Sequence, residues 1–170
     1  MNASPDTSSP AVSRPPSFWI KLPAILAIVF CLVLGGSFLA WNPERVSSRY
    51  RAIAQKAVDE KDFPTALVAA GRLLSFGGES RNEALFLLVQ ANLGAGHNAE
   101  AAGILQMIAP LNRPVFAPAH LFVARTLMAR PNRSTQMDRA IETQLGNTLT
   151  LHPDSAEAKE LLARLRGVEE

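Results

Sequence analysis

Cysteine and aromatic residues are scarce in this chain of 170 residues, which has one cysteine and 6% aromatic side chains. Cys31 has no second cysteine with which to form an internal disulfide, so cysteine usage leaves the redox compartment undecided. A large excess of one charge is also missing, because the net charge is only +2. Proteins that bind nucleic acid usually present a concentrated basic face. The composition therefore argues against a nucleic-acid partner.

Groups that carry out chemistry are scarce as well. The three histidines, His97, His120 and His152, lie far apart in the sequence, and no pair has the i, i+4 spacing with which a helix holds a metal ion. No glycine-rich phosphate loop or nucleophile motif accompanies them. We therefore expect no enzyme activity, no metal and no cofactor.

Charged residues are absent from one long apolar run, Leu22 to Pro43. At ~1.5 Å per residue, a helix of this run is long enough to cross a hydrocarbon core of ~30 Å. Trp19 and Trp41 flank the run, where aromatic rings settle at the two membrane interfaces. We predict a single transmembrane helix over residues 18–42, which makes the lipid bilayer a partner and the chain a single-pass membrane protein.

A cleaved signal peptide is the alternative interpretation of this run, because Arg14 and Lys21 precede it. Cleavage would release a secreted module. The run is longer than a usual signal-peptide core, and bulky Phe30 before Cys31 does not fit a lipoprotein signal. Basic residues are more numerous just after the run than before it, so the positive-inside rule favours a cytoplasmic location for the rest of the chain.

The residues before the run, 1–17, are rich in serine and proline and almost without large apolar side chains. Such a segment cannot bury enough apolar surface to offset the entropy lost on ordering. We predict a disordered tail there.

Beyond Asn42, three sets of residues with a similar internal spacing begin at Tyr50, Leu85 and His120, which are 35 residues apart. The sets are Tyr50-x-x-Ile53-Ala54-x-x-Ala57, Leu85-x-x-Leu88-Val89-x-x-Asn92 and His120-x-x-Val123-Ala124-x-x-Leu127. The second half of each unit recurs too, with Ala66-x-x-x-Ala70, Ala101-x-x-x-Leu105 and, after a four-residue lengthening, Ala140 with Leu145.

These residues resemble the tetratricopeptide repeat, a helix-turn-helix unit of ~34 residues with small residues where its helices cross closely. The resemblance covers residues 43–166. It implies an all-α fold in which about three helix-turn-helix units and a C-terminal capping helix follow the transmembrane helix, with residues 167–170 as a short tail. An irregular antiparallel bundle with coincidental spacing is the alternative.

Residues that start and stop helices agree with this register. Ser80 and Glu83 have the spacing of a capping box, and Gly77-Gly78 can end the helix before them. Asp154 with Glu157 can cap the last helix.

The resemblance also implies that the chain binds another protein or peptide, because the first helices of such repeats line a groove. We expect a membrane-anchored scaffold or adaptor, with an accessory or chaperone-like subunit of a membrane complex as the alternative. Each groove position can also be an ordinary solvated helix position. The groove positions are Arg51, Gln55, Asp59, Gln90 and Arg125.

Basic residues outnumber acidic ones between Ala101 and Ala140, where Asp138 is the only acid. Such a set can dock an acidic partner or anionic lipid if its members converge on one surface. The alternative is a scattered, solvated set. The residues concerned are Arg113, Arg125, Arg130, Arg133 and Arg139.

Overall fold

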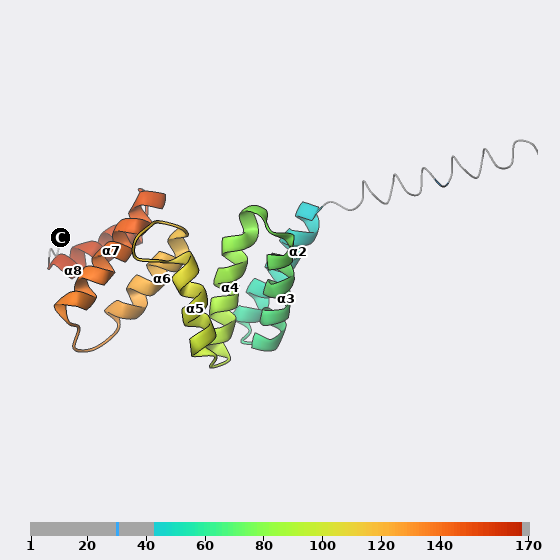
Figure 1. The fold of residues 1–170 in the computed structure, drawn as a ribbon, viewed down its shortest axis with the longest axis horizontal. Helices are drawn as coiled ribbons and strands as arrows, with labels where there is room; N and C mark the ends of the chain where they lie inside the picture. The colour runs from blue at the N-terminus through green and yellow to red at the C-terminus, as the bar shows by residue number, and fades with distance from the viewer. Residues whose placement is uncertain (1–29, 31–42, 168–170) are drawn as a thin grey trace, which may run out of the picture. The chain divides into compact units, whose positions relative to one another are not determined.

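The computed structural model describes residue 30 and residues 43–167, and among these it contains helices and no strand. The all-α class is thus confirmed for this part of the chain. The helices follow one another as consecutive antiparallel pairs (Figure 1). They are α2 (Pro43–Asp59), α3 (Phe63–Phe76), the short 3-10 helix η1 (Gly78–Ser80), α4 (Arg81–Gly94), α5 (Asn98–Ile108), α6 (Ala117–Met128), α7 (Thr135–Leu151) and α8 (Ala156–Arg166).

The predicted disordered tail, 1–17, and nearly all of the predicted transmembrane helix, 18–42, lie outside the described residues. Within residue 30 and residues 43–167, no helix is both long enough and apolar enough to cross a bilayer.

The turn between α2 and α3 shows how local sequence places a helix start. The side chain of Asp62 accepts a hydrogen bond from the backbone N–H of Thr65 at 3.3 Å, and Pro64 occupies the first turn, where a missing N–H costs nothing. At the other end of α3, Gly77 has φ of 65°, a left-handed conformation that glycine adopts without strain. The predicted stop at Gly77 is confirmed.

Two predicted caps are wrong in detail. Ser80 has a helical conformation and makes no side-chain cap; its Oγ instead accepts a hydrogen bond from Arg51 at 3.0 Å. The last helix is capped by Ser155, whose Oγ accepts from the N–H of Ala158 at 3.3 Å, and not by Asp154. At Ser80, a hydrogen bond from Arg51 on another helix overrides the local pattern. At the last helix, Ser155 follows Asp154 directly and takes the capping position.

Helices α2 to α4 pack tightly because small residues lie where they cross. Helix α2 contacts both α3 and α4, and α3 contacts α4. Ala66 of α3 is fully buried against Ala57 of α2 and Ala91 of α4. A larger side chain at this crossing would hold the helices apart. The prediction that Ala66 and Ala101 are closely packed small positions is confirmed, since both are fully buried.

The regular packing weakens between α5 and α6. Pro110 follows the end of α5 closely, so α5 stops at Ile108, whereas α3 continues past the equivalent residue, Leu73, to Phe76. A loop over residues 109–116 takes the place of that last turn. Thr126 of α6 is exposed, although Ala91 at the equivalent place in α4 is buried. Figure 1 accordingly shows α6 inclined to α5, while α3, α4 and α5 lie side by side.

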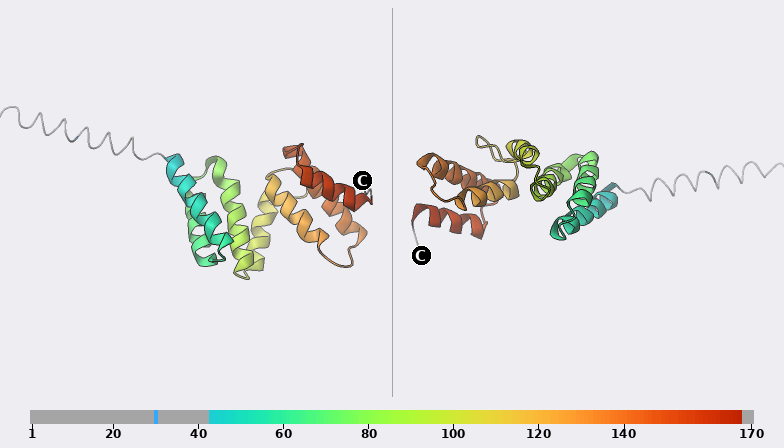
Figure 2. Two further views of the ribbon diagram at one scale, coloured as in Figure 1. Left: turned by 180° about the vertical axis from the view of Figure 1, so that it is seen from behind. Right: turned by 90° about the horizontal axis from the view of Figure 1, so that it is seen from below.

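Helices α6, α7 and α8 form a second group around their own core (Figure 2). The fully buried members of this core are Ala124 of α6, Ile141 and Leu145 of α7, and Ala158 of α8. The apolar side of α8 packs against them through Leu161, Leu162 and Leu165. On the exposed face of α8, Arg164 lies 2.6 Å from Glu160.

A buried hydrogen-bond chain ties the 109–116 loop to this second group. His120 and Gln144 are both buried. The N–H of Val115 donates to Nε2 of His120 at 3.1 Å, so the ring proton lies on Nδ1, which donates to Oε1 of Gln144. The amide of Gln144 in turn donates to the carbonyl of Ala109 at 3.1 Å. Both ends of the loop are therefore held by one pair of side chains.

Gly94, the last residue of α4, lies against the ring of Phe63 at the start of α3. A Cβ at this position would lie 2.0 Å from the ring, far inside contact distance. Overpacking by a methyl group costs about 1–3 kcal/mol, and the better helix propensity of alanine returns up to about 1 kcal/mol. We expect Gly94→Ala to lower the free energy of unfolding by about 1–2 kcal/mol in denaturant titration.

Gly103→Ala is the matched control for this change. Gly103 lies inside α5, and nothing stands within 4 Å of a Cβ built there. The control should therefore raise the stability by up to about 1 kcal/mol through helix propensity. Equal effects of the two substitutions would contradict the packing of Phe63 on Gly94.

Candidate interaction surface

Four of the five predicted groove residues lie on α2 and α4. Arg51 reaches from α2 to α4, where its Nη2 lies 2.8 Å from a carboxylate oxygen of Glu83. Gln55 donates to Asp59 at 3.0 Å along α2. Gln90 of α4 is partly buried, and its Oε1 has no hydrogen-bond partner among the described residues. The structure therefore brings Arg51 to α4 and leaves an unused acceptor on Gln90.

The fifth residue, Arg125 of α6, pairs with Glu157 of α8 and with none of the other four. In both arginine pairs, Arg51–Glu83 and Arg125–Glu157, the glutamate follows the arginine by the same number of residues. Each pair joins the first helix of a hairpin to the helix that follows that hairpin, α2 to α4 and α6 to α8. The same interhelical ion pair thus recurs in the two groups of helices.

The packed face of α8 resembles that of α4 when residues are compared at the sequence offset that relates Arg51 to Arg125. Ala84 of α4 is fully buried, and so is Ala158 at the corresponding place in α8. Leu87 and Leu88 likewise correspond to Leu161 and Leu162, which pack against the core of the second group. Helix α8 therefore meets α6 and α7 with the side chains that α4 uses against α2 and α3.

The five predicted basic-patch arginines are spread over a loop, two helices and the α6–α7 turn. Arg125 pairs with Glu157, and Arg133 lies 3.1 Å from Asp138 and also donates to the carbonyl of Met128. These two charges are balanced by acids. The remaining three are exposed: Arg113 in the 109–116 loop, Arg130 beyond α6 and Arg139 on α7.

The three histidines have three different environments. His97 is exposed at the start of α5, His120 is buried between α6 and α7, and His152 lies exposed at the end of α7. Within residue 30 and residues 43–167, no group of three or more histidine, cysteine, aspartate or glutamate residues is placed to hold a metal ion.

The outer face of α2 differs from the equivalent face of α4. Ala84, Leu87 and Ala91 of α4 are buried against α2 and α3. The equivalent residues of α2, namely Arg49, Ala52 and Lys56, are exposed. Two of these three carry charge, as is common at exposed helix positions. A shallow hollow nearby is lined by Tyr50, Ile53, Pro64, Thr65, Val68 and Ala69.

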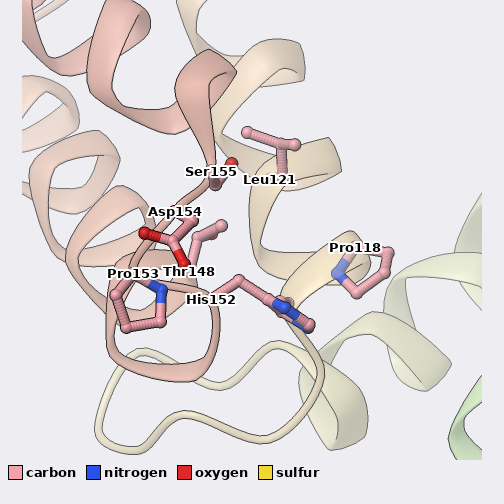
Figure 3. Close-up of a pocket in the computed structure, with 8 residues that line it drawn as sticks. Pro118, Leu121, Thr148, His152, Pro153, Asp154 and Ser155 are labelled. Carbon is pink, nitrogen blue, oxygen red and sulfur yellow. The ribbon is translucent and has the colours of Figure 1, made fainter.

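A larger pocket of about 480 Å³ lies between the start of α6 and the turn from α7 to α8 (Figure 3). Pro118 and Leu121 of α6 form one side, and His152 and Pro153 of the turn form another. We call it the α6/α8 pocket. Its full lining is Ala117, Pro118, Leu121, Thr148, His152, Pro153, Asp154 and Ser155.

The polar groups of the α6/α8 pocket fall into two kinds. Thr148 donates to the carbonyl of Gln144 at 3.0 Å and Ser155 caps α8, so both hydroxyls already have structural bonds. His152 and Asp154 are exposed and make no side-chain hydrogen bond or ion pair with the described residues. A ligand in the pocket would therefore meet apolar walls with one imidazole and one carboxylate available.

A smaller hollow of about 280 Å³ lies at the equivalent place in the first group of helices, between α2 and η1. We call it the α2/η1 pocket, and it is lined by Glu44, Ser47, Phe76, Gly77, Glu79 and Ser80.

Sequence reasoning missed both pockets. In the sequence, Asp154 has only the pattern of a helix cap, and nothing marks Pro118 or Pro153 as part of a pocket. Their walls come from segments about 30 residues apart, and no local pattern links those segments. The available signal was the repeat itself, because it places the start of one first helix beside the turn that precedes the next.

No protein-family model, curated protein or solved structure gives a significant match to this chain.

Proposed function

We propose that residues 43–166 form a tetratricopeptide-like module that binds another protein, and that residues 18–42 hold it at a membrane as a single-pass anchor. The chain would act as a scaffold or adaptor beside the bilayer, on the cytoplasmic side that the basic residues after residue 42 favour. An accessory subunit of a membrane complex is a narrower form of the same role.

The observation that carries the proposal is the repeated link between the first helix of a hairpin and the helix that follows that hairpin. Arg51–Glu83 joins α2 to α4, and Arg125–Glu157 joins α6 to α8 at the same sequence separation. An exposed ion pair contributes little stability, about 0–1 kcal/mol. Its recurrence supports a repeated hairpin geometry in which first helices share one face, and such a face is where helical repeats bind their partners.

Site-specific photo-crosslinking in the full-length protein tests the binding role. A photoreactive residue at Gln55, on the first helix α2, should crosslink in native membranes to a discrete partner. The matched position is Gln106, an exposed glutamine on the second helix α5. It should not capture that partner, because second helices lie away from the shared face of first helices.

Equal capture from both positions, or no discrete product from Gln55, would refute a specific binding face on the first helices. The membranes are washed with alkaline carbonate before illumination. Loss of the full-length chain from the washed pellet would refute the anchor and favour a secreted module.

A further inference from the structure

We propose that the α6/α8 pocket and the α2/η1 pocket are repeat-related subsites for one extended, basic peptide of the partner. The peptide places a bulky apolar side chain in the α6/α8 pocket and a lysine or arginine at the acidic rim of each pocket. This inference rests on the proposed binding function and names the chemistry of the ligand.

The equivalence of the two pockets follows from their linings. Residues 44 and 47 of α2 line the first, and residues 118 and 121 of α6, at the same spacing, line the second. Residues 79 and 80 close the first pocket, and residues 153 and 154 close the second. All four correspondences have the offset that relates Arg51–Glu83 to Arg125–Glu157. The pockets therefore arise from the repeated packing of one first helix beside the turn before the next.

The α6/α8 pocket has the chemistry of an apolar anchor site. Leu121, Pro118 and Pro153 present hydrocarbon surface. Its volume of about 480 Å³ lies within the ~300–1,000 Å³ typical of ligand pockets, and so it can hold a whole side chain with some of its backbone. Burial of that side chain would contribute affinity in proportion to the apolar area removed from water.

The rims of both pockets favour a cation. Asp154 borders the α6/α8 pocket, and Glu44 and Glu79 border the α2/η1 pocket. Neither lining contains a lysine or an arginine. Arg51 donates a hydrogen bond to Ser80, which lines the α2/η1 pocket, and the charge of Arg51 is paired with Glu83. Asp154 and Glu79 are exposed and have no ion-pair partner among the described residues, so both carboxylates are available to a basic peptide.

The probe for this inference is a library of displayed random peptides selected on the purified full-length protein. Enriched peptides should share a bulky apolar residue with lysine or arginine on its flanks. Their affinity should fall roughly tenfold for Asp154→Lys, since a charge-assisted contact is replaced by repulsion. Glu79→Lys should weaken the binding of those peptides that are long enough to reach the α2/η1 pocket as well. Glu100→Lys is the matched control, because Glu100 is an exposed, unpaired acid at the start of α5, and it should leave affinity unchanged.

Charge exchange makes the test specific to the contact. A peptide with glutamate in place of its basic residue should bind Asp154→Lys better than it binds the unchanged protein. Circular dichroism checks that each variant is folded. Enriched peptides that bind Asp154→Lys, Glu79→Lys and Glu100→Lys equally well would overturn the pocket assignment and leave the binding function standing. Failure to enrich any peptide above a blank surface would overturn the peptide inference, whereas a discrete crosslink from Gln55 would still support the binding function.

Discussion

The variant His120→Ala is expected to unfold with a free energy roughly 2–5 kcal/mol lower than that of the unchanged protein. The substitution removes a fully buried side chain, which leaves a cavity between α6 and α7. It also leaves the N–H of Val115 and the Oε1 of Gln144 without their partner. Each unsatisfied buried group adds about 1–3 kcal/mol to the cost. Urea titration followed by circular dichroism measures the change.

His97→Ala serves as the control for this substitution. His97 is exposed at the start of α5 and its side chain makes no capping hydrogen bond. Its replacement should change the free energy of unfolding by no more than about 0.5 kcal/mol. A similar loss in both variants would show that the His120–Gln144 chain does not hold the 109–116 loop.

The His120–Gln144 pair also predicts that the free energy of unfolding depends on pH. Burial lowers the pKa of His120 below its ordinary value of 6.5, and the hydrogen bond to Gln144 opposes this shift in part. The unfolded chain therefore binds a proton at higher pH than the folded one. The contribution of neutral His120 is fully present above pH 6.5 and falls by up to about 1.4 kcal/mol per pH unit as the pH drops from 6.5 to the lower folded pKa.

The stability difference between the unchanged protein and His120→Ala isolates this contribution, because all other titrating groups are common to both. That difference should be constant above pH 6.5 and should shrink below it. A difference that grows as the pH falls would mean that folding favours the charged imidazole.

Ala66→Leu is expected to lower the free energy of unfolding by about 1–3 kcal/mol or more. Ala66 is fully buried where α2, α3 and α4 cross, with Ala57 and Ala91 against it. The longer side chain must either adopt a strained rotamer or push two helices apart, because both neighbours are small. Thermal and urea unfolding measure the loss.

Ala102→Leu is the matched control, since Ala102 lies on the exposed side of α5. It should change the stability by no more than about 0.5 kcal/mol, because the new side chain points into solvent. If Ala66→Leu were as stable as this control, the close crossing at Ala66 would be refuted.

Much of the local structure followed from residues that act within one turn of helix. Asp62 and Pro64 place the start of α3, and Gly77 ends it through a positive φ. The period of 35 residues predicted buried small side chains at Ala66 and Ala101, and both are buried. These features were predictable because capping, proline geometry and side-chain periodicity depend on near neighbours in the chain.

Other outcomes depended on residues far apart in sequence. Ser80 has the pattern of a cap, yet it accepts a hydrogen bond from Arg51, which lies on another helix. The groove positions were predicted as one set, but Arg125 pairs with Glu157 in the second group of helices. Local sequence does not indicate which distant charged residue will lie closest. The ion-pair partners could therefore be identified only in the folded structure.

By itself, then, the sequence determined the helical class of the described part and the end of α3 at Gly77, because these follow from short-range sterics and hydrogen bonding. Only the tertiary structure decided the incline of α6, the burial of His120 with Gln144 and the two equivalent pockets. Pro110 ends α5 early, and the resulting 109–116 loop needs partners for its backbone groups. Those partners come from α6 and α7, and their positions depend on how whole helices pack.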